Sequence, residues 1–180
     1  MKVTIKLIIV LTVICAVCSA LLAAVFKNTE EPINNALKTR TGKAAALVMP
    51  AGSGLPQLCE AKGISYFIAK KGGQVTAVAI EGHSKNGYGG EVQLMVGLGM
   101  DGKLISFEVV KASETPGLGS KMSSDAFKNP IKGRPINGNW TVKKDGGEID
   151  AITAATISSR AALECIRDAI AKFNTIRESL

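Results

Sequence analysis

Residues 113–122, SETPGLGSKM, combine a carboxylate with backbone that is open to close approach. Pro116 fixes one φ angle, whereas Gly117 and Gly119 can adopt positive φ. The segment also places an apolar side chain, Leu118, beside the carboxylate of Glu114. We therefore expect this loop to be shaped to hold a ligand through one apolar surface, one carboxylate and several backbone amides.

Residues 150–159, DAITAATISS, place hydroxyls and two small alanines where a loop gives way to the last helix. The first backbone amides of a helix lack partners, and the helix dipole favours an anion there. A phosphate group could bind at this point. The alternative is ordinary N-capping, because threonine and serine are common capping residues.

A third segment, residues 81–94, carries four glycines around Tyr88. Its composition fits a flexible loop. It fits equally a backbone surface that a flat or phosphorylated ligand can approach closely, with Tyr88 as an aromatic wall. The sequence leaves both interpretations open.

Other apparent motifs have simpler explanations. Residues 97–102 match G-x-G-x-x-G, but a strand-like segment follows them, so we interpret them as a hairpin turn and not as a dinucleotide site. His83 and Ser84 lack the context of a catalytic triad. No cluster has metal-ligand spacing, and we expect no metal site. Cys59 and Cys165 could pair, but the sequence does not show whether they meet.

Residues 7–26 form an uncharged apolar run of 20 residues, about the length of a membrane-spanning helix. The alternative is a cleaved signal peptide ending near residues 18–20. The run is longer than a signal peptide requires, which favours a retained anchor. Lys2 and Lys6 before the run, and acidic residues soon after it, place the N-terminus in the cytoplasm and the remainder on the outer face.

A net charge of +7 is typical of nucleic-acid-binding proteins, but other features of the sequence argue against this function. The basic residues are scattered and aromatic residues make up only 4% of the chain, so we expect no nucleic-acid partner. We expect the lipid bilayer to be one partner, through the apolar run.

The remaining sequence predicts an α+β fold: a small, mostly antiparallel sheet packed with helices. Four β-like segments cover residues 64–71, 73–82, 91–100 and 103–112, and a fifth covers 138–144. Helices are expected from about Pro32, over residues 123–129, and from about 156 to 178, where the apolar stripe is Ala162, Ile166, Ala169, Ile170 and Phe173. We divide the chain into an anchor with a short cytoplasmic tip (1–26), a helical connector (27–63) and an outer domain (64–180).

Three motifs in this order resemble a known family: residues 88–90 (YGG), 114–119 (ETPGLG) and 153–156 (TAAT). They are similar to the covalent-FMN domain found in the G subunit of the Rnf ion-translocating ferredoxin:NAD oxidoreductase. The C subunit of the sodium-translocating NADH:quinone reductase is related but usually longer. The resemblance covers nearly all of the chain and is weakest over residues 27–63.

The resemblance implies that FMN is bound covalently, through its phosphate, to the hydroxyl of Thr156. A dedicated flavin transferase makes this bond in the family, and Asp150 matches its recognition motif. Ala154 stands where the family commonly has glycine. The other cofactor-binding residues implied are Tyr88, Gly89, Gly90, Glu114, Thr115, Pro116, Gly117, Leu118, Gly119, Lys121, Thr153, Ala154 and Ala155.

In this interpretation the isoalloxazine reaches toward residues 115–119, with Leu118 against its face. Lys121 is a candidate to stabilise the anionic reduced flavin. The implied function is an electron relay in a cell-membrane complex, with other membrane subunits as partners and no activity expected for this chain by itself. A membrane-anchored adaptor without flavin and a stand-alone extracytoplasmic flavoprotein reductase remain alternatives. The coupling ion, the electron donor and acceptor, and the flavin potential are left open.

Overall fold

The structure is a computed structural model that describes residues 2–180, without the side chains of residues 2, 3, 34, 38 and 179. The chain divides into two compact units, Met1–Thr39 and Arg40–Leu180. The side chain of Lys2, which contributes to the predicted orientation, lies outside the described part.

The first unit consists of helix α1, which spans Lys2–Leu47 and so continues into the second unit. Every side chain from Thr4 to Ile33 is exposed. The helix is long and apolar enough to cross a membrane, in agreement with the predicted anchor. An uncovered apolar surface of this length is unfavourable in water, which fits insertion into lipid.

Pro32 lies inside α1 and does not begin a new helix, so the predicted helix start at this residue is wrong. Proline is favoured in the first turn of a helix because it has no N–H to leave unpaired. In the interior it removes one backbone hydrogen bond and its ring crowds the preceding turn, but here the helix continues on both sides.

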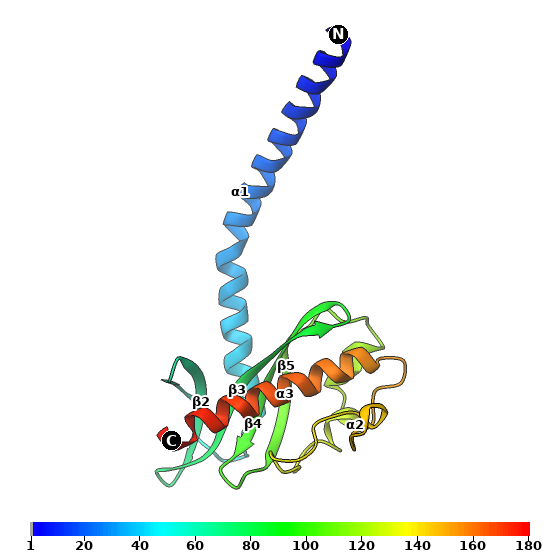
Figure 1. Ribbon diagram of the computed structural model, residues 1–180. Helices are drawn as coiled ribbons and strands as arrows, with labels where there is room; N and C mark the ends of the chain where they lie inside the picture. Colours follow the sequence, from blue (N-terminus) through cyan, green and yellow to red (C-terminus); the bar gives the residue numbers. More distant parts are fainter. Residues whose placement is uncertain (1) are drawn as a thin grey trace. The chain divides into compact units, whose positions relative to one another are not determined.

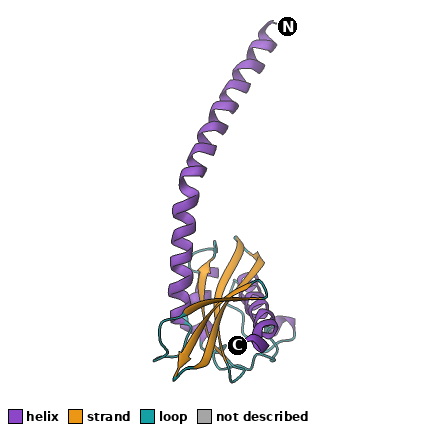
Figure 2. Ribbon diagram, turned by 90° about the vertical axis from the view of Figure 1, so that its left-hand side faces the viewer, coloured by secondary structure: helices purple, strands orange, loops and turns teal. Residues whose placement is uncertain are grey.

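The second unit is built on one antiparallel sheet whose five strands follow each other in chain order (Figures 1 and 2). The strands are β1 (Gln57–Ala61), β2 (Ile64–Lys71), β3 (Gln74–Gly87), β4 (Gly90–Gly99) and β5 (Leu104–Lys111). The four central predictions of strands are confirmed, and residues 97–102 form the β4–β5 hairpin as expected. Strand β1 is a further strand that the sequence did not reveal. It lies within the predicted helical connector.

Helix α3 (Thr156–Ile176) packs across β3 and β4 (Figure 1). All five residues of its predicted apolar stripe are buried, and they join the inward-facing side chains of the sheet in one core. On β4, Gly97 is needed because a Cβ there would lie 2.1 Å from the carbonyl oxygen of Val48, just beyond α1. Close backbone packing therefore covers the sheet at this point.

Short helices and turns complete the domain. They are η1 (Gly119–Ser123), α2 (Asp125–Lys128), η2 (Lys143–Asp145) and η3 (Arg177–Ser179). The prediction of a short helix near 123–129 is confirmed by α2. The predicted strand at 138–144 is wrong, since this segment bends into η2 and makes only an isolated bridge between Val142 and Ile149. Trp140 is buried there in the core and its indole donates to the carbonyl of Ile136, so core packing and its own turn hold this segment, and not pairing in the sheet.

Candidate functional site

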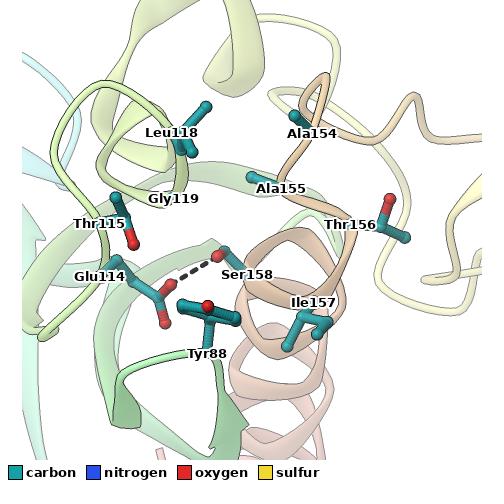
Figure 3. A pocket seen from close by; sticks show the side chains of 10 residues that line it. All are labelled: Tyr88, Glu114, Thr115, Leu118, Gly119, Ala154, Ala155, Thr156, Ile157 and Ser158. Atoms are coloured by element: carbon teal, nitrogen blue, oxygen red, sulfur yellow. Dashed lines mark hydrogen bonds between the residues drawn. The ribbon is translucent and has the colours of Figure 1, made fainter.

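A pocket of about 480 Å³ lies at the N-terminal end of α3 (Figure 3). Its volume falls within the range of small-molecule and cofactor sites. It lies between the 114–119 loop and the segment that enters α3, and the β3–β4 hairpin contributes an aromatic side chain. Its lining residues are Tyr88, Glu114, Thr115, Leu118, Gly119, Ala154, Ala155, Thr156, Ile157 and Ser158.

The pocket brings together the three motifs that the sequence singled out. Eight of the residues predicted to bind a cofactor line it, one from the hairpin and the rest from the two loops. Of the other predicted residues, Pro116, Gly117, Gly89 and Gly90 are not in the lining. Lys121, Asp150 and Thr153 line a neighbouring depression of about 250 Å³.

The β3–β4 hairpin is ordered structure and not a flexible loop, because β3 continues to Gly87 and pairs there with Gly90. A Cβ on Gly89 would lie 1.7 Å from the carbonyl oxygen of Ser113. Glycine is therefore required for the hairpin to approach the loop after β5. This close approach holds Tyr88, which is 70% exposed, at the edge of the pocket.

Glu114 links the loop to α3. Its Oε2 accepts a hydrogen bond of 2.5 Å from the Ser158 hydroxyl, drawn in Figure 3, and its Oε1 accepts a long one of 3.5 Å from the amide of Gly89. A Cβ on Gly119 would lie 2.5 Å from both the Glu114 carboxylate and the Ser158 hydroxyl. The bare backbone of Gly119 is thus part of the pocket wall.

Helix α3 begins without a side-chain cap. Ala155 occupies the N-cap position and makes no side-chain hydrogen bond, so the N-capping alternative for Thr156 is wrong. Thr156 is the first residue of the helix and is partly exposed. The Ser159 hydroxyl is engaged elsewhere, accepting from the Ile152 amide and donating to the Ala155 carbonyl. None of the described side chains caps the first amides of α3, which are thus left for an external acceptor.

Ala154 has a left-handed backbone, with φ of 60°. Few residues other than glycine adopt this conformation, because the Cβ crowds the following carbonyl. The turn therefore stores strain at the position that leads the chain into α3.

Sequence reasoning missed three residues at this site. Ile157 and Ser158 line the pocket from the first turn of α3, and Lys144 lies beside it, where its Nζ donates to the Thr156 hydroxyl at 3.4 Å. The first two lie within residues 150–159, so the position of this segment at the start of the last helix could have indicated them. The position of Lys144 depends on the tertiary fold.

The cysteines make no site. All four are free thiols, so Cys59 and Cys165 are not paired. Cys165 is buried and donates to the Val92 carbonyl. Burial, aided by the negative charges of Asp168 and Glu164, raises the pKa of this thiol to about 12. Within residues 2–180, no group of histidine, cysteine and carboxylate side chains could hold a metal ion.

Residues 87–171 match the family model of the FMN-binding domain. This range contains every residue of the pocket. The G subunit of the ion-translocating oxidoreductase complex of Vibrio cholerae is 31% identical, over 96% of this chain and 91% of its own length. That of Pseudomonas aeruginosa is 30% identical, over 89% and 84%. The chain belongs to this family of G subunits.

The G subunit of Photorhabdus laumondii is more similar, with 38% identity, but over only 63% of this chain and 57% of its own length. Among solved structures, the C subunit of the Na⁺-translocating NADH-quinone reductase from Parabacteroides distasonis aligns with a TM-score of 0.58 and 17% identity, over 82% of this chain and 94% of its own. At this identity the similarity concerns the fold. It agrees with the predicted α+β architecture.

Proposed function

We propose that this member of the G-subunit family carries FMN on Thr156 and relays electrons within a membrane-bound ion-translocating oxidoreductase complex. The main support is the coincidence of two findings. The FMN-binding family match contains the whole pocket, and the pocket opens at an uncapped helix N-terminus whose first residue is a threonine.

The residues of the site fit the phosphate of FMN. Phosphate binds well at a helix N-terminus, where unpaired amides and the helix dipole both favour negative charge. The hydroxyl of Thr156 is partly exposed at this point and within reach of the amino group of Lys144. No side chain caps the helix and competes for the amides within the described part of the chain.

The residues also fit a flat aromatic ring. Apolar surface lines the pocket from Leu118, Tyr88 and Ile157, and each of these side chains is at least 39% exposed. Exposed apolar side chains around a pocket indicate a site that a ligand covers. Glu114, held by Ser158, and Thr115 supply polar groups that can fix the orientation of the ring.

Attachment requires one substitution at phosphorus. The Thr156 oxygen forms a bond to the phosphorus of a flavin nucleotide donor, the hydroxyl proton passes to a base on the transferase, and the bond from phosphorus to the donor's leaving group breaks. The Asp150 side chain is 76% exposed and forms an ion pair with Lys143 at the surface, which leaves it accessible as the proposed recognition residue for a flavin transferase.

Bound FMN supplies the electron chemistry, and the protein supplies position and electrostatics. We propose that Lys121, an exposed residue of the neighbouring depression, favours the negatively charged reduced cofactor. The midpoint potential should then fall in Lys121→Gln. An unchanged potential would remove this role from Lys121.

We propose that α1 anchors the protein in the cell membrane, with its N-terminus in the cytoplasm and the second unit on the outer face. Other membrane proteins of the complex would then be its partners. The apolar stretch from Leu7 to Phe26 has no charged residue to offer an ion path, so translocation belongs to the assembly. Membrane vesicles that contain this chain without the rest of the complex should therefore show no ion pumping.

The experiment is coexpression with a flavin transferase, followed by denaturing gel electrophoresis under ultraviolet light. The native protein should give a fluorescent band that Thr156→Val loses. Thr175→Val, an exposed threonine near the other end of α3, is the matched control and should keep the band. No fluorescence in the native protein, with an unshifted intact mass, would instead favour a flavin-free adaptor.

A further inference from the structure

Lys144 lies on η2, outside the residues that line the pocket, and yet its amino group reaches the proposed attachment site. Its Nζ donates to the Thr156 hydroxyl at 3.4 Å. This contact joins η2 to the start of α3, and the loop of residues 146–155 separates the two in the sequence. The contact therefore depends on how η2 is held against α3.

An ion pair holds η2 in this place. The Asp145 carboxylate accepts two hydrogen bonds of 2.7 Å from the guanidinium of Arg160, on the second turn of α3. Bidentate pairs of this kind fix orientation as well as distance. The bond to Arg160 lowers the pKa of Asp145, and the same bond raises the pKa of Arg160.

The turn itself is closed at its base. The Lys143 amide donates to the Ile149 carbonyl at 2.8 Å, and the Gly147 amide donates to the Val142 carbonyl at 3.1 Å. Gly146 has φ of 82° and ends η2 in the left-handed region, which glycine adopts without strain. Lys144 is thus carried by a short segment that is fixed at both ends.

The two adjacent lysines of η2 differ in their partners. Lys143 forms an ion pair with Asp150 at 2.8 Å. Lys144 has no carboxylate within ion-pair distance among the described side chains, and its one hydrogen bond there is to Thr156. The charge of Lys144 also helps to lower the pKa of Asp145, but the carboxylate of Asp145 is bonded to Arg160, and the direct contact of the Lys144 amino group is at the start of α3.

We propose that Lys144 binds the phosphate of the flavin at Thr156, together with the free amides of α3. This inference rests on the proposed function. A phosphate joined to Thr156 keeps a negatively charged oxygen, and a charge-assisted hydrogen bond from Lys144 would complement the helix dipole. Asp145 and Arg160 set the position of the lysine.

The test uses the full-length protein, a purified flavin transferase and its flavin nucleotide donor. The initial rate of covalent flavin incorporation is compared among the native protein, Lys144→Gln, Lys144→Arg and the matched control Lys143→Gln. The rate should fall about tenfold in Lys144→Gln, as expected for loss of a hydrogen bond between charged groups. It should be largely retained in Lys144→Arg, and in Lys143→Gln it should change less than about twofold.

A second readout separates an effect on the protein from an effect on the transferase. Each variant is flavinylated to completion, and its unfolding temperature is compared with that of its flavin-free form. The gain in unfolding temperature on flavinylation should be smaller in Lys144→Gln than in Lys143→Gln, and the difference should shrink as salt screens the charge.

A native-like rate in Lys144→Gln would overturn the inference, as would an equal loss in Lys143→Gln or no rescue in Lys144→Arg. A slower rate with an unchanged gain in unfolding temperature would assign Lys144 to transferase binding and also overturn it. Failure of the native protein to take up any flavin would instead contradict the proposed function.

Discussion

The strained backbone at Ala154 makes a quantitative prediction. A left-handed conformation costs a residue with a Cβ about 1–2 kcal/mol, and Ala154 has φ of 60°. Glycine removes this strain but loses about 0.4–1 kcal/mol more conformational entropy on folding. Because the Ala154 side chain is exposed, no buried contact is lost. Ala154→Gly should therefore raise the free energy of unfolding by about 0.5–1 kcal/mol.

The neighbouring residue is a matched control with the opposite sign. Ala155 has φ of −136° and is buried, so glycine relieves nothing there. Ala155→Gly should lower the free energy of unfolding by about 1.5 kcal/mol, from lost burial of a methyl group and the entropy of glycine. The two variants should then differ by about 2 kcal/mol, which corresponds to roughly 6 °C in Tm for a domain of this size.

Trp140 provides the assay, because it is the only tryptophan of the chain and is 5% exposed. Its fluorescence is followed during thermal unfolding of the full-length protein in detergent. Equal destabilisation by Ala154→Gly and Ala155→Gly would refute the strain at Ala154. It would also remove the physical reason to expect glycine to be favoured at this position.

Two further predictions concern Gly119 and Cys165. A Cβ at Gly119 would clash with the Glu114 carboxylate and the Ser158 hydroxyl, so Gly119→Ala should lower the free energy of unfolding by about 1–3 kcal/mol and slow flavinylation. Trp140 fluorescence measures the unfolding and the fluorescent gel band measures the flavinylation. An unchanged free energy of unfolding and an unchanged band would contradict the packing. Burial raises the pKa of the Cys165 thiol from its ordinary value of 9.0 to about 12. The folded state therefore favours the protonated thiol, and this contribution to the free energy of unfolding is complete below pH 9 and is lost as the pH rises toward 12. At pH 8 a thiol reagent should therefore label Cys165 only on unfolding, and fast labelling of the folded protein would contradict its burial.

Much of the fold could be predicted because its signals are local. The central strands are rich in β-branched residues between glycine turns, and the stripe on α3 repeats at helical spacing. Strand β1, QLCEA, is short and partly polar, so only its pairing with β2 identifies it. The segment at 138–144 has the composition of a strand but finds no strand partner, because hydrogen bonding to a sheet edge is a tertiary property.

The sequence predicted site residues only where they belong to a motif of the family that it resembles. The resemblance named the loop at 114–119 and the segment before α3, and the structure brings both to one pocket. Lys121 and Thr153 lie in a neighbouring depression, which their sequence positions do not indicate. Lys144 was missed because its contact with Thr156 depends on the ion pair between Asp145 and Arg160. Such contacts between distant segments leave no periodic signal in the sequence.

The attachment of FMN to Thr156 is tested most directly by peptide mass mapping of the native protein coexpressed with a flavin transferase. Trypsin cleaves after Lys144 and Arg160, so residues 145–160 form one peptide that contains both candidate threonines. We expect a peptide heavier by FMN less one water, with fragment ions that place the added mass on Thr156. An unmodified peptide, or the added mass on Thr153, Ser158 or Ser159, would contradict this attachment.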